Sequence, residues 1–522
     1  MSAPVLLVIG LALTIALAIL ARRLELPYPI VFVLAGTALA FVPGLPPVRI
    51  PPDWIFFVVL PPLLFSAAWG IDWIIFRGNL RPILQLAIGL VIATTLAVAF
   101  VADKLVPALG IAGAFVLGAI VSPPDPVAAS ATFERFTIPR RIVAVVEGEG
   151  LLNDATALVI YGYAVAAAAS TVFSLSAAAQ SFVIVVIGGV ALGAGIAFGF
   201  EALARALQHY ELSDSLIENF LLIACPYIAY SIGQTVHVSG VLAVVIAGIT
   251  ISRRSTVVYG PQTRLVAYNV WNLWVYVLNA YVFLAIGLHL RAYTASGFHF
   301  LTYLPAALAI SAVAIVVRLL WMFPAAWIPR LIPAVRRADP LPPSSWITLI
   351  GWTGMRGIVS LAAALALPRT FAQRDVIVFI TFVVIFVTLV GQGLTLSPLM
   401  RWLHVEREGD ENRHELEIRL RALEAGVRRL EHLRGETTDH HALEDIEALR
   451  NEYDRRVEHL RENLDGATPA PRVTEVIHSS AEVEALRAER FAVMALRDSG
   501  EIPDDIFRRI QYDLDLAESR LS

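Results

Sequence analysis

The sequence is poor in the groups on which enzymes and metal proteins depend. Its 522 residues include one cysteine, Cys225, which excludes an intrachain disulfide and lies in an apolar run. No segment has the ligand spacing of a zinc site, the glycine pattern of a P-loop or the residues of a catalytic triad. The missing P-loop argues against a pump driven by ATP. We therefore expect neither an enzyme nor a bound cofactor, and no feature predicts a nucleic-acid partner.

Hydrophobic residues, by contrast, make up 57% of the chain, and the mean hydropathy is +0.68. A soluble globular domain is usually about 45–50% apolar. The excess lies before residue 401, whereas the rest of the chain is dense in Arg and Glu. We therefore predict a membrane domain over residues 1–400 and a soluble, cytoplasmic helical tail over residues 401–522.

Thirteen apolar runs before residue 401 are long enough to cross a bilayer, which takes about 17–25 residues. This pattern predicts an all-α polytopic membrane protein with about 13 transmembrane helices. The predicted spans are residues 3–21, 27–46, 51–71, 80–102, 107–133, 141–170, 178–204, 215–233, 236–252, 265–288, 300–324, 344–367 and 374–400.

The distribution of basic residues predicts the orientation of these spans. Fifteen lie in the odd-numbered loops, with Arg318 counted among them, and five lie in the even-numbered loops. Positively charged loops stay in the cytoplasm. We therefore expect the amino terminus outside and the tail inside. The first run lacks a basic n-region and is followed by Arg22 and Arg23, which favours a span over a signal peptide.

Thirteen spans also allow an inverted repeat, in which spans 1–6 and 8–13 form the two halves. This arrangement, which is inferred from topology, pairs span 5 with span 12, the two most interrupted runs. The interruptions are residues 122–126 in span 5 and 352–357 in span 12. Two broken segments at matching positions of two halves indicate the transport site of a secondary transporter.

The stretch from Ser122 to Asp154 contains four carboxylates between apolar runs: Asp125, Glu147, Glu149 and Asp154. A charge at the bilayer centre costs at least roughly 2.5 kcal/mol, so each carboxylate there needs a function or a partner. Three prolines around Asp125 prevent a regular helix. The freed carbonyl groups of residues 121–123, which include Pro123, become candidate cation ligands. A structural alternative is a proline kink in which Asp125 caps the next helix.

Asp154 is the strongest candidate for the site. It lies about 20 Å along a span that begins at Arg140 and Arg141, and therefore near the middle of the membrane. We predict that it binds a cation, Na+ in the first instance, in competition with protons. The alternative is a neutral aspartic acid that is hydrogen-bonded to a neighbouring helix. Asn153 precedes it and belongs to the predicted site.

The two glutamates of the same span are predicted to have other roles. Arg356 is the basic residue placed deep within a span, and it requires an anion there. Glu149 faces away from Asp154 on the helix, and we predict a structural ion pair between Glu149 and Arg356. Glu147 shares the face of Asp154 about 10 Å nearer the cytoplasm, where it would form an ion funnel or remain an interfacial glutamate.

The tail shows helical periodicity. Apolar residues repeat at spacings of four and three from Leu416 to Leu430, which predicts the seam of a coiled coil or a helical hairpin. A similar pattern follows from Ile446 to Leu464. Residues 467–472 are expected to be a linker, and two further helices are expected from residue 475 to the end.

Three motifs carry a resemblance to a known family. They are E-G-L-L-N-D at residues 149–154, D-P-V at 125–127 and G-M-R-G at 354–357. By their residues and their order along the chain, they resemble the monovalent cation:proton antiporters of the CPA1 type, the bacterial NhaP-like and animal NHE-like sodium/proton exchangers. The resemblance covers most of residues 1–400, and the tail looks like that of a bacterial subgroup.

The resemblance implies a six-helix core that carries ions and a separate domain that forms a homodimer, with elevator-like alternation. It implies that Asp154 binds ions and protons, that Asp125 lies in the unwound crossing and that Asn153 supports the site. It also implies the buried pair of Glu149 and Arg356, and a location in the lipid of a bacterial inner membrane.

Two positions depart from the family pattern. Several relatives have a threonine where this chain has Pro124, and a serine or threonine where it has Gly150. Both hydroxyl ligands are therefore missing. Backbone carbonyl groups, water or three nearby hydroxyl groups could replace them: Ser122, Ser130 and Thr156. The choice among Na+, K+ and Li+ is left open by these changes.

We predict a secondary antiporter that exchanges Na+, or K+ or Li+, for H+ in pH and sodium homeostasis. Because Asn153 stands beside Asp154, one carboxylate serves both ions, and exchange is expected to be electroneutral. The first alternative is a K+-selective exchanger. Alternatives of other classes are an intramembrane aspartyl hydrolase, whose dyad of Asp125 and Asp154 would share a proton about 3 Å apart, and a membrane sensor with structural carboxylates.

Overall fold

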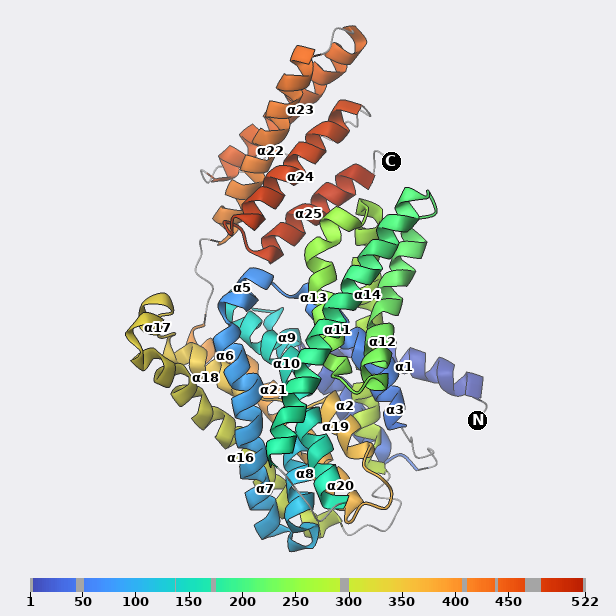
Figure 1. The fold of residues 1–522 in the computed structure, drawn as a ribbon, viewed down its shortest axis with the longest axis vertical. Helices are drawn as coiled ribbons and strands as arrows, with labels where there is room; N and C mark the ends of the chain where they lie inside the picture. Colours follow the sequence, from blue (N-terminus) through green and yellow to red (C-terminus); the bar gives the residue numbers. More distant parts are fainter. Residues whose placement is uncertain are drawn as a thin grey trace.

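A computed structural model describes most of the chain. The described residues are 3–43, 51–136, 138–169, 175–291, 300–405, 411–436, 440–464 and 480–519. Within these ranges the regular structure is entirely helical, with no β-strand. Figure 1 shows long helices side by side in the larger part of the molecule and the tail helices at one end.

The first half of the larger part runs to α11 and contains one broken span. Its helices are α1 (Ala3–Arg23), α2 (Tyr28–Ala40), α3 (Pro52–Trp54), α4 (Leu60–Gly70), α5 (Trp73–Gly78), α6 (Leu80–Leu84), α7 (Val91–Leu105), α8 (Gly110–Val121), α9 (Val127–Phe133), α10 (Arg140–Ala169) and α11 (Leu175–His209). The π-helical turns Ile55–Val59 and Gln85–Leu90 join α3 to α4 and α6 to α7, and a 3-10 turn at Pro107–Leu109 precedes α8.

The second half of the larger part contains the other broken span. Its helices are α12 (Ser215–Thr235), α13 (Gly240–Val258), α14 (Pro261–Leu288), α16 (Phe300–Trp327), α17 (Pro333–Ala338), α18 (Ser344–Trp352), α19 (Ile358–Leu365), α20 (Arg374–Phe386) and α21 (Gly393–Leu403). A 3-10 turn at Ile328–Leu331 follows α16, and a π-helical turn at Val387–Gln392 joins α20 to α21.

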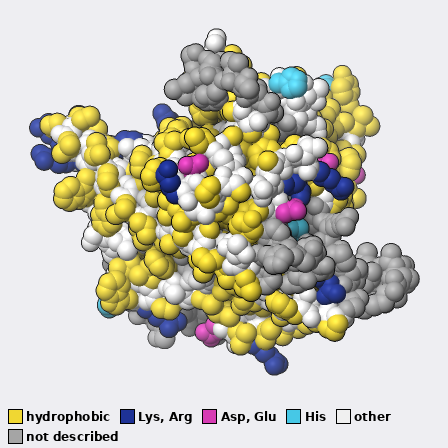
Figure 2. All heavy atoms as spheres, turned by 90° about the horizontal axis from the view of Figure 1, so that it is seen from below, with side chains coloured by type: hydrophobic (Ala, Val, Ile, Leu, Met, Phe, Trp, Pro, Cys, Tyr) yellow, Lys and Arg dark blue, Asp and Glu magenta, His cyan; other side chains and the backbone are white. Residues whose placement is uncertain are grey.

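Nine helices among the described residues are long and apolar enough to cross a membrane, counting joined segments as one helix. Many large hydrophobic side chains on them are exposed, such as Phe220 on α12 and Leu320 on α16. Figure 2, seen from the end opposite the tail, shows hydrophobic side chains over much of that face. These features confirm an all-helical membrane protein, whereas the count of thirteen spans and the inverted repeat stay predictions.

Both predicted interruptions are breaks in helices. Residues 122–126 separate α8 from α9, and residues 353–357 separate α18 from α19. Pro123, Pro124 and Pro126 account for the first break, because proline lacks the N–H that a helix needs and its ring clashes with the preceding turn. Irregular backbone at this depth is tolerated where it is buried in protein or lines a cavity.

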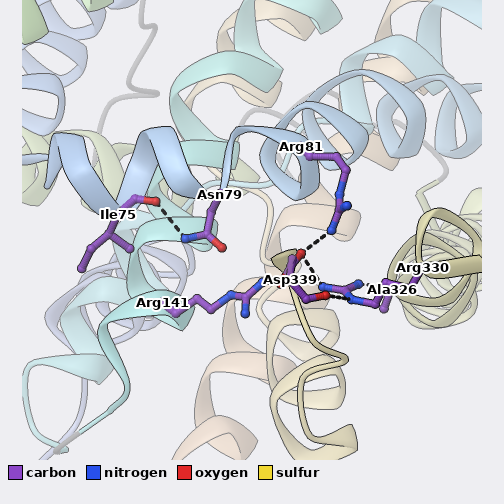
Figure 3. Close-up of polar contacts among 7 residues, drawn as sticks. All are labelled: Ile75, Asn79, Arg81, Arg141, Ala326, Arg330 and Asp339. Carbon is purple, nitrogen blue, oxygen red and sulfur yellow. Dashed lines mark hydrogen bonds and ion pairs between the residues drawn. The ribbon is translucent and has the colours of Figure 1, made fainter. Parts of the chain in front are cut away.

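The Asp339 side chain lies among three arginine side chains that come from three different helical segments (Figure 3). The Asp339 carboxylate accepts hydrogen bonds from Arg141 at 2.6 Å, from Arg330 at 2.7 Å and from Arg81. These arginines belong to the start of α10, the turn after α16 and α6. Although partial burial opposes it, the hydrogen bonds from Arg141 and Arg330 lower the pKa of Asp339 below its ordinary value.

The tail consists of α22 (Glu411–Glu436), α23 (His440–Leu464), α24 (Ser480–Asp498) and α25 (Asp504–Ser519). The predicted helices are therefore present, while the predicted linker at 467–472 lies outside the described residues. Leu430 of the first predicted seam packs with Leu449 and Tyr453 of the second. A second apolar cluster joins α22, α24 and α25. Figure 1 shows α25 as the tail helix nearest the membrane part.

Hydrogen bonds and ion pairs attach α25 to the membrane part. The Asp72 carboxylate accepts the N–H of Asp504 at 2.9 Å, and the Asp504 carboxylate accepts the N–H of Trp73 at 2.7 Å. Each aspartate thus satisfies an N–H at the start of the other's helix, a group that has no partner within its own helix. Further along α25, the Asp515 carboxylate forms a buried ion pair with Arg264 of α14.

Candidate ion-binding site

The two broken spans cross at Asp125. Its backbone N–H donates to the carbonyl oxygen of Met355 at 2.7 Å. Its carboxylate accepts the N–H of Val127 at 2.9 Å and that of Ile358 at 3.2 Å, the first residues of α9 and α19. One carboxylate therefore compensates the positive ends of both half-helices. The predicted capping role and the predicted place in the unwound crossing both fit this geometry.

The crossing is close because residue 357 has no side chain. A Cβ atom on Gly357 would lie 1.7 Å from Oδ2 of Asp125, so any other residue would push the two segments apart. From the opposite side, the Asn153 side chain donates from Nδ2 to the carbonyl oxygen of Pro124 at 2.9 Å. Asn153 thus contacts the broken backbone next to Asp125.

A cavity of about 360 Å³ lies against this crossing. Asp125 and Asp154 are both in its wall, together with the first turn of α19 and with Tyr28 and Asn279 on the far side. Asp154 is buried, and within the described part of the chain its carboxylate accepts no hydrogen bond and forms no ion pair. Its oxygen atoms are therefore available to a cation or a proton from the cavity.

A second cavity of about 290 Å³ continues from the first toward the tail. The two cavities share Gly70, Ser130, Glu134 and Glu147 in their walls. Glu147 therefore stands between Asp154 and the tail side of the molecule, which is the place predicted for an ion funnel. The outer wall of the second cavity includes Arg140 and, from α25, the side chains of Asp505 and Arg508.

The four predicted replacement ligands have different surroundings. Pro123 and Ser130 line the larger cavity, but the Ser130 hydroxyl donates to Glu147 at 3.2 Å. Ser122 and Thr156 are not in the cavity wall, and their hydroxyl groups bond to carbonyl oxygens of their own helices at 3.0 and 3.4 Å. Of the four predicted replacement ligands, Pro123 and Ser130 therefore lie next to the cavity, and the Ser130 hydroxyl already contacts Glu147.

The structure corrects the partner predicted for Glu149. Its carboxylate accepts two hydrogen bonds from Arg318 of α16, at 2.5 and 2.7 Å, and both side chains are fully buried. Arg318 lies within α16 and not in a loop, so the count of loop arginines included it wrongly. A Cβ atom on Gly354 would lie 2.3 Å from Cδ of Arg318, which explains the need for glycine there.

Arg356 is also buried but is oriented differently. Its backbone N–H donates to the Thr388 hydroxyl at 3.0 Å. Its Nε and Nη1 atoms have no hydrogen-bond partner among the described residues, and its interactions with charged groups are with Arg318 and Glu149. The glutamate therefore has two arginines near it, and the sequence could not tell which one it contacts.

Two residues of this region, Arg318 and Ser360, were not predicted from the sequence. The signal for Arg318 was its position six residues before the end of the span predicted at 300–324. Ser360 lies in the first turn of α19 and lines the larger cavity. Ser360 could have been predicted from its position directly after the second break, because the first turn of that helix must face the crossing.

The helices and the site define a class of protein. Carboxylates beside two broken, crossing helices within a membrane domain are the arrangement of a secondary transporter. The chain belongs to the family described as sodium/hydrogen exchanger, transmembrane, whose profile matches residues 9–402. This match confirms the family predicted from the three motifs.

Relatives and solved structures agree with this assignment. An uncharacterized Na+/H+ exchanger of Mycobacterium bovis is 30% identical, over 99% of this chain and 97% of its own. The low-affinity Na+/H+ antiporter NhaS1 of Synechocystis is 30% identical over 76% of this chain and 74% of its own. The sodium proton antiporter MjNhaP1 of Methanocaldococcus jannaschii has a similar fold, with a TM-score of 0.59 and 16% identity over 78% of this chain and 100% of its own.

Proposed function

We propose that this protein exchanges Na+ for H+ across a membrane, and that both ions compete for Asp154. The observation that carries the proposal is the position of Asp154: it is buried, faces a cavity at the crossing of two broken helices, and has free carboxylate oxygens among the described residues. Asp125 has a supporting role, because both of its oxygen atoms accept backbone N–H groups. The backbone at Pro123 and the Asn153–Pro124 contact complete the proposed site.

The two glutamates of α10 differ in how their charges are compensated. The Glu149–Arg318 pair neutralises one buried carboxylate away from the cavity, so this glutamate does not compete for the transported ion. Glu147 remains in the wall between the two cavities, where a negative charge attracts cations along the path. These positions support the proposed roles of Glu147 as a funnel and of Asp154 as the binding carboxylate.

We place residues 1–400 in the plasma membrane of a bacterium, with the amino terminus outside and residues 401–522 in the cytoplasm. The excess of arginine in one set of loops supports this orientation. Three of these arginines, Arg81, Arg141 and Arg330, meet at Asp339 on the side that carries the tail. A homodimer with elevator-like movement of the ion-carrying core is the assembly that the family resemblance implies.

A broader cation selectivity is the second candidate. An antiporter of Bacillus pumilus described as acting on sodium, potassium, lithium and rubidium is 30% identical over 72% of this chain. Pro124 and Gly150 lack two hydroxyl groups of the family pattern, so these positions do not select Na+ over K+ or Li+. Exchange of K+ or Li+ for H+ at Asp154 is therefore proposed as the alternative substrate range.

The aspartyl hydrolase alternative is not favoured. Its dyad requires two carboxyl groups that share a proton. Among the described residues no hydrogen bond joins Asp125 to Asp154, and Asp125 is engaged by Val127 and Ile358 instead. A membrane sensor would not require Asp154 to face a cavity.

The test compares wild type with Asp154→Asn and Asp154→Glu in proteoliposomes that carry an imposed pH gradient. Addition of NaCl should collapse the gradient with wild type, and KCl and LiCl additions give the selectivity. Asp154→Asn should eliminate the response while its thermal unfolding and elution volume stay like those of wild type. Sodium-driven exchange by folded Asp154→Asn would contradict the assignment of this carboxylate.

A further inference from the structure

The hydroxyl group of Ser360 is buried beside the crossing without a partner. Ser360 is 1% exposed, and its Oγ atom has no hydrogen bond to any of the described residues. The side chain nevertheless lies in the wall of the same cavity as Asp125 and Asp154. Burial of a hydroxyl group without a hydrogen bond is unfavourable, and such groups in folded proteins usually contact water or an ion.

The position of Ser360 is fixed by the crossing itself. It lies two residues after Ile358, whose N–H donates to Asp125, in the first turn of α19. The preceding backbone is held by the hydrogen bond between Asp125 and the carbonyl oxygen of Met355. The Ser360 hydroxyl is therefore held on the second broken span, while Asp154 comes to the cavity from α10.

Three other hydroxyl groups near the site already have hydrogen-bond partners. Those of Ser122 and Thr156 bond to their own helices, and that of Ser130 bonds to Glu147. A hydroxyl group at position 150 is excluded by packing, because a Cβ atom there would lie 2.4 Å from the ring of Pro126. Two serine hydroxyl groups in the cavity wall therefore have no hydrogen bond in the described structure. Ser66 is partly exposed on α4, whereas Ser360 is buried beside Asp125 on the second broken span.

We infer that the Ser360 hydroxyl is a ligand of the transported cation, together with the Asp154 carboxylate. This inference rests on the proposed function and adds a ligand from the second broken span. A cation that enters the cavity gains an uncharged oxygen ligand from α19 and a carboxylate from α10. When a proton occupies Asp154 instead, Ser360 has no cation to bind. Ser360 therefore increases the affinity of the site for the cation and does not affect the binding of the proton.

One other buried polar atom in the cavity wall lacks a partner among the described residues, Oδ1 of Asn279. Its amide group already donates to the Tyr28 hydroxyl at 3.2 Å, on the side of the cavity formed by α2 and α14. Asn279 therefore has a partner across from the crossing and is attached to neither broken span. This contrast favours Ser360 as the ligand beside Asp125 and Asp154.

The test uses Ser360→Ala and Ser360→Cys, which remove the hard oxygen, and Ser360→Thr, which keeps it. Ser311→Ala is the matched control, because Ser311 is buried on α16 and its hydroxyl is satisfied by the carbonyl oxygen of Ala307 at 2.7 Å. Apparent KM values for Na+, Li+ and K+ are measured in proteoliposomes at fixed alkaline pH. The shift of Tm on addition of NaCl to detergent-purified protein gives a second readout.

Ser360→Ala and Ser360→Cys should raise KM for Na+ about three- to tenfold, with a smaller change for K+, and should reduce the sodium-dependent shift of Tm. Ser360→Thr and Ser311→Ala should resemble wild type. If Ser360→Ala does not fold, Ser360→Cys decides the question, since it keeps the shape. Wild-type KM and Tm shift in a folded alanine or cysteine variant would overturn the inference. Absence of sodium exchange by wild type would instead overturn the proposed function.

Discussion

Glu149 of α10 and Arg318 of α16, which are 169 residues apart in the chain, are joined by two buried hydrogen bonds of 2.5 and 2.7 Å. Arg318 also donates to the carbonyl oxygen of Ile350, next to the second break, at 3.1 Å. The pair therefore holds α10, which carries Asp154, against α16 and the end of α18. Its position away from the cavity makes it part of the support of the site.

Removal of either member of this pair should destabilise the protein, but to different degrees. Breaking a buried ion pair leaves an uncompensated charge and costs about 3–5 kcal/mol. Glu149→Gln leaves both Arg318 and Arg356 without a carboxylate, whereas Arg318→Gln leaves Glu149 with Arg356 still near it. We therefore expect the lower Tm for Glu149→Gln, and partial recovery in the double variant.

The measurement is thermal unfolding in detergent for the two single variants, the double variant and Arg356→Gln. A double-mutant cycle gives the coupling between Glu149 and Arg318, free of unrelated losses. If Arg356→Gln instead shows strong coupling to Glu149 and Arg318→Gln shows none, the pair predicted from the sequence is the one that holds the helices.

The choice between these two arginines shows what the sequence could not provide. Apolar runs and proline clusters are local signals, so the helices and both breaks could be predicted from them. Asp125 and Asp154 could be expected to lie close together, because the broken span that contains Asp125 is followed directly by the span that contains Asp154. The partner of Glu149 depends instead on how α10, α16 and α18 pack, which no local pattern encodes.

Ser360 was missed for a related reason. Its hydroxyl has significance only because α19 begins at Asp125 and because Ser122, Ser130 and Thr156 are bonded elsewhere. Such a distribution of hydrogen bonds is a property of the assembled crossing. Residue types at single positions, which revealed that Pro124 and Gly150 lack hydroxyl groups, could indicate the deficit but not the residue that compensates it.

Exchange should be electroneutral if Asp154 alone changes its occupant. Asn153 supplies no second carboxylate, Glu149 is paired with Arg318, and both oxygens of Asp125 accept backbone N–H groups. One Na+ and one H+ then carry equal charge in opposite directions. With the potential clamped by valinomycin and K+, the rate of sodium-driven pH change should not vary with voltage.

Exchange of two protons for one Na+ would move one net charge across the membrane in each cycle. The membrane potential would then contribute about 2.3 kcal/mol per charge per 100 mV to the driving force. A steady sodium-dependent current on a supported membrane would therefore refute the one-for-one scheme. Asp125 would then be the next carboxylate to examine, since it shares the cavity with Asp154.

Asp339 should contribute stability at neutral pH that disappears in acid. Its pKa is lowered in the folded state, so its ionised form stabilises the fold above the ordinary pKa of about 3.8, and this contribution is lost as pH falls through the folded value. Asp339→Asn leaves Arg81, Arg141 and Arg330 close together without their shared carboxylate. Its Tm should be lower than that of wild type at pH 7.

The difference in Tm between Asp339→Asn and wild type should shrink as the pH is lowered below about 4. Asp375→Asn is the control, because the Asp375 side chain is 75% exposed and lies 3.6 Å from Arg374. That variant should match wild type throughout. A pH-independent difference for Asp339→Asn would show that the loop is held by packing and not by its charge.

The tail should influence the access of cations, because α25 places opposite charges at the outer cavity. Arg508 and Asp505 are both in its wall, and Asp505 pairs with Arg140 at 2.6 Å. Arg508→Gln removes a positive charge from the path and should lower KM for Na+ applied from the tail side. Asp505→Asn removes the negative charge and should raise it. Each change should be about two- to threefold at low ionic strength and smaller at high ionic strength.

Inside-out membrane vesicles present the proposed cytoplasmic side to the medium, and choline chloride sets the ionic strength without supplying a substrate. Removal of residues 405–522 takes away both charges, and since the site lies before residue 400, the truncated protein should still exchange Na+ for H+. Complete loss of exchange in a truncated protein that inserts normally would make the tail part of the transport machinery.

If Arg508→Gln and Asp505→Asn shift KM for Na+ in the same direction, the docking of α25, and not its charges, controls the access of cations. Opposite shifts that fade with added choline chloride are the signature of a charged entrance, because screening weakens the effect of both side chains on an approaching cation.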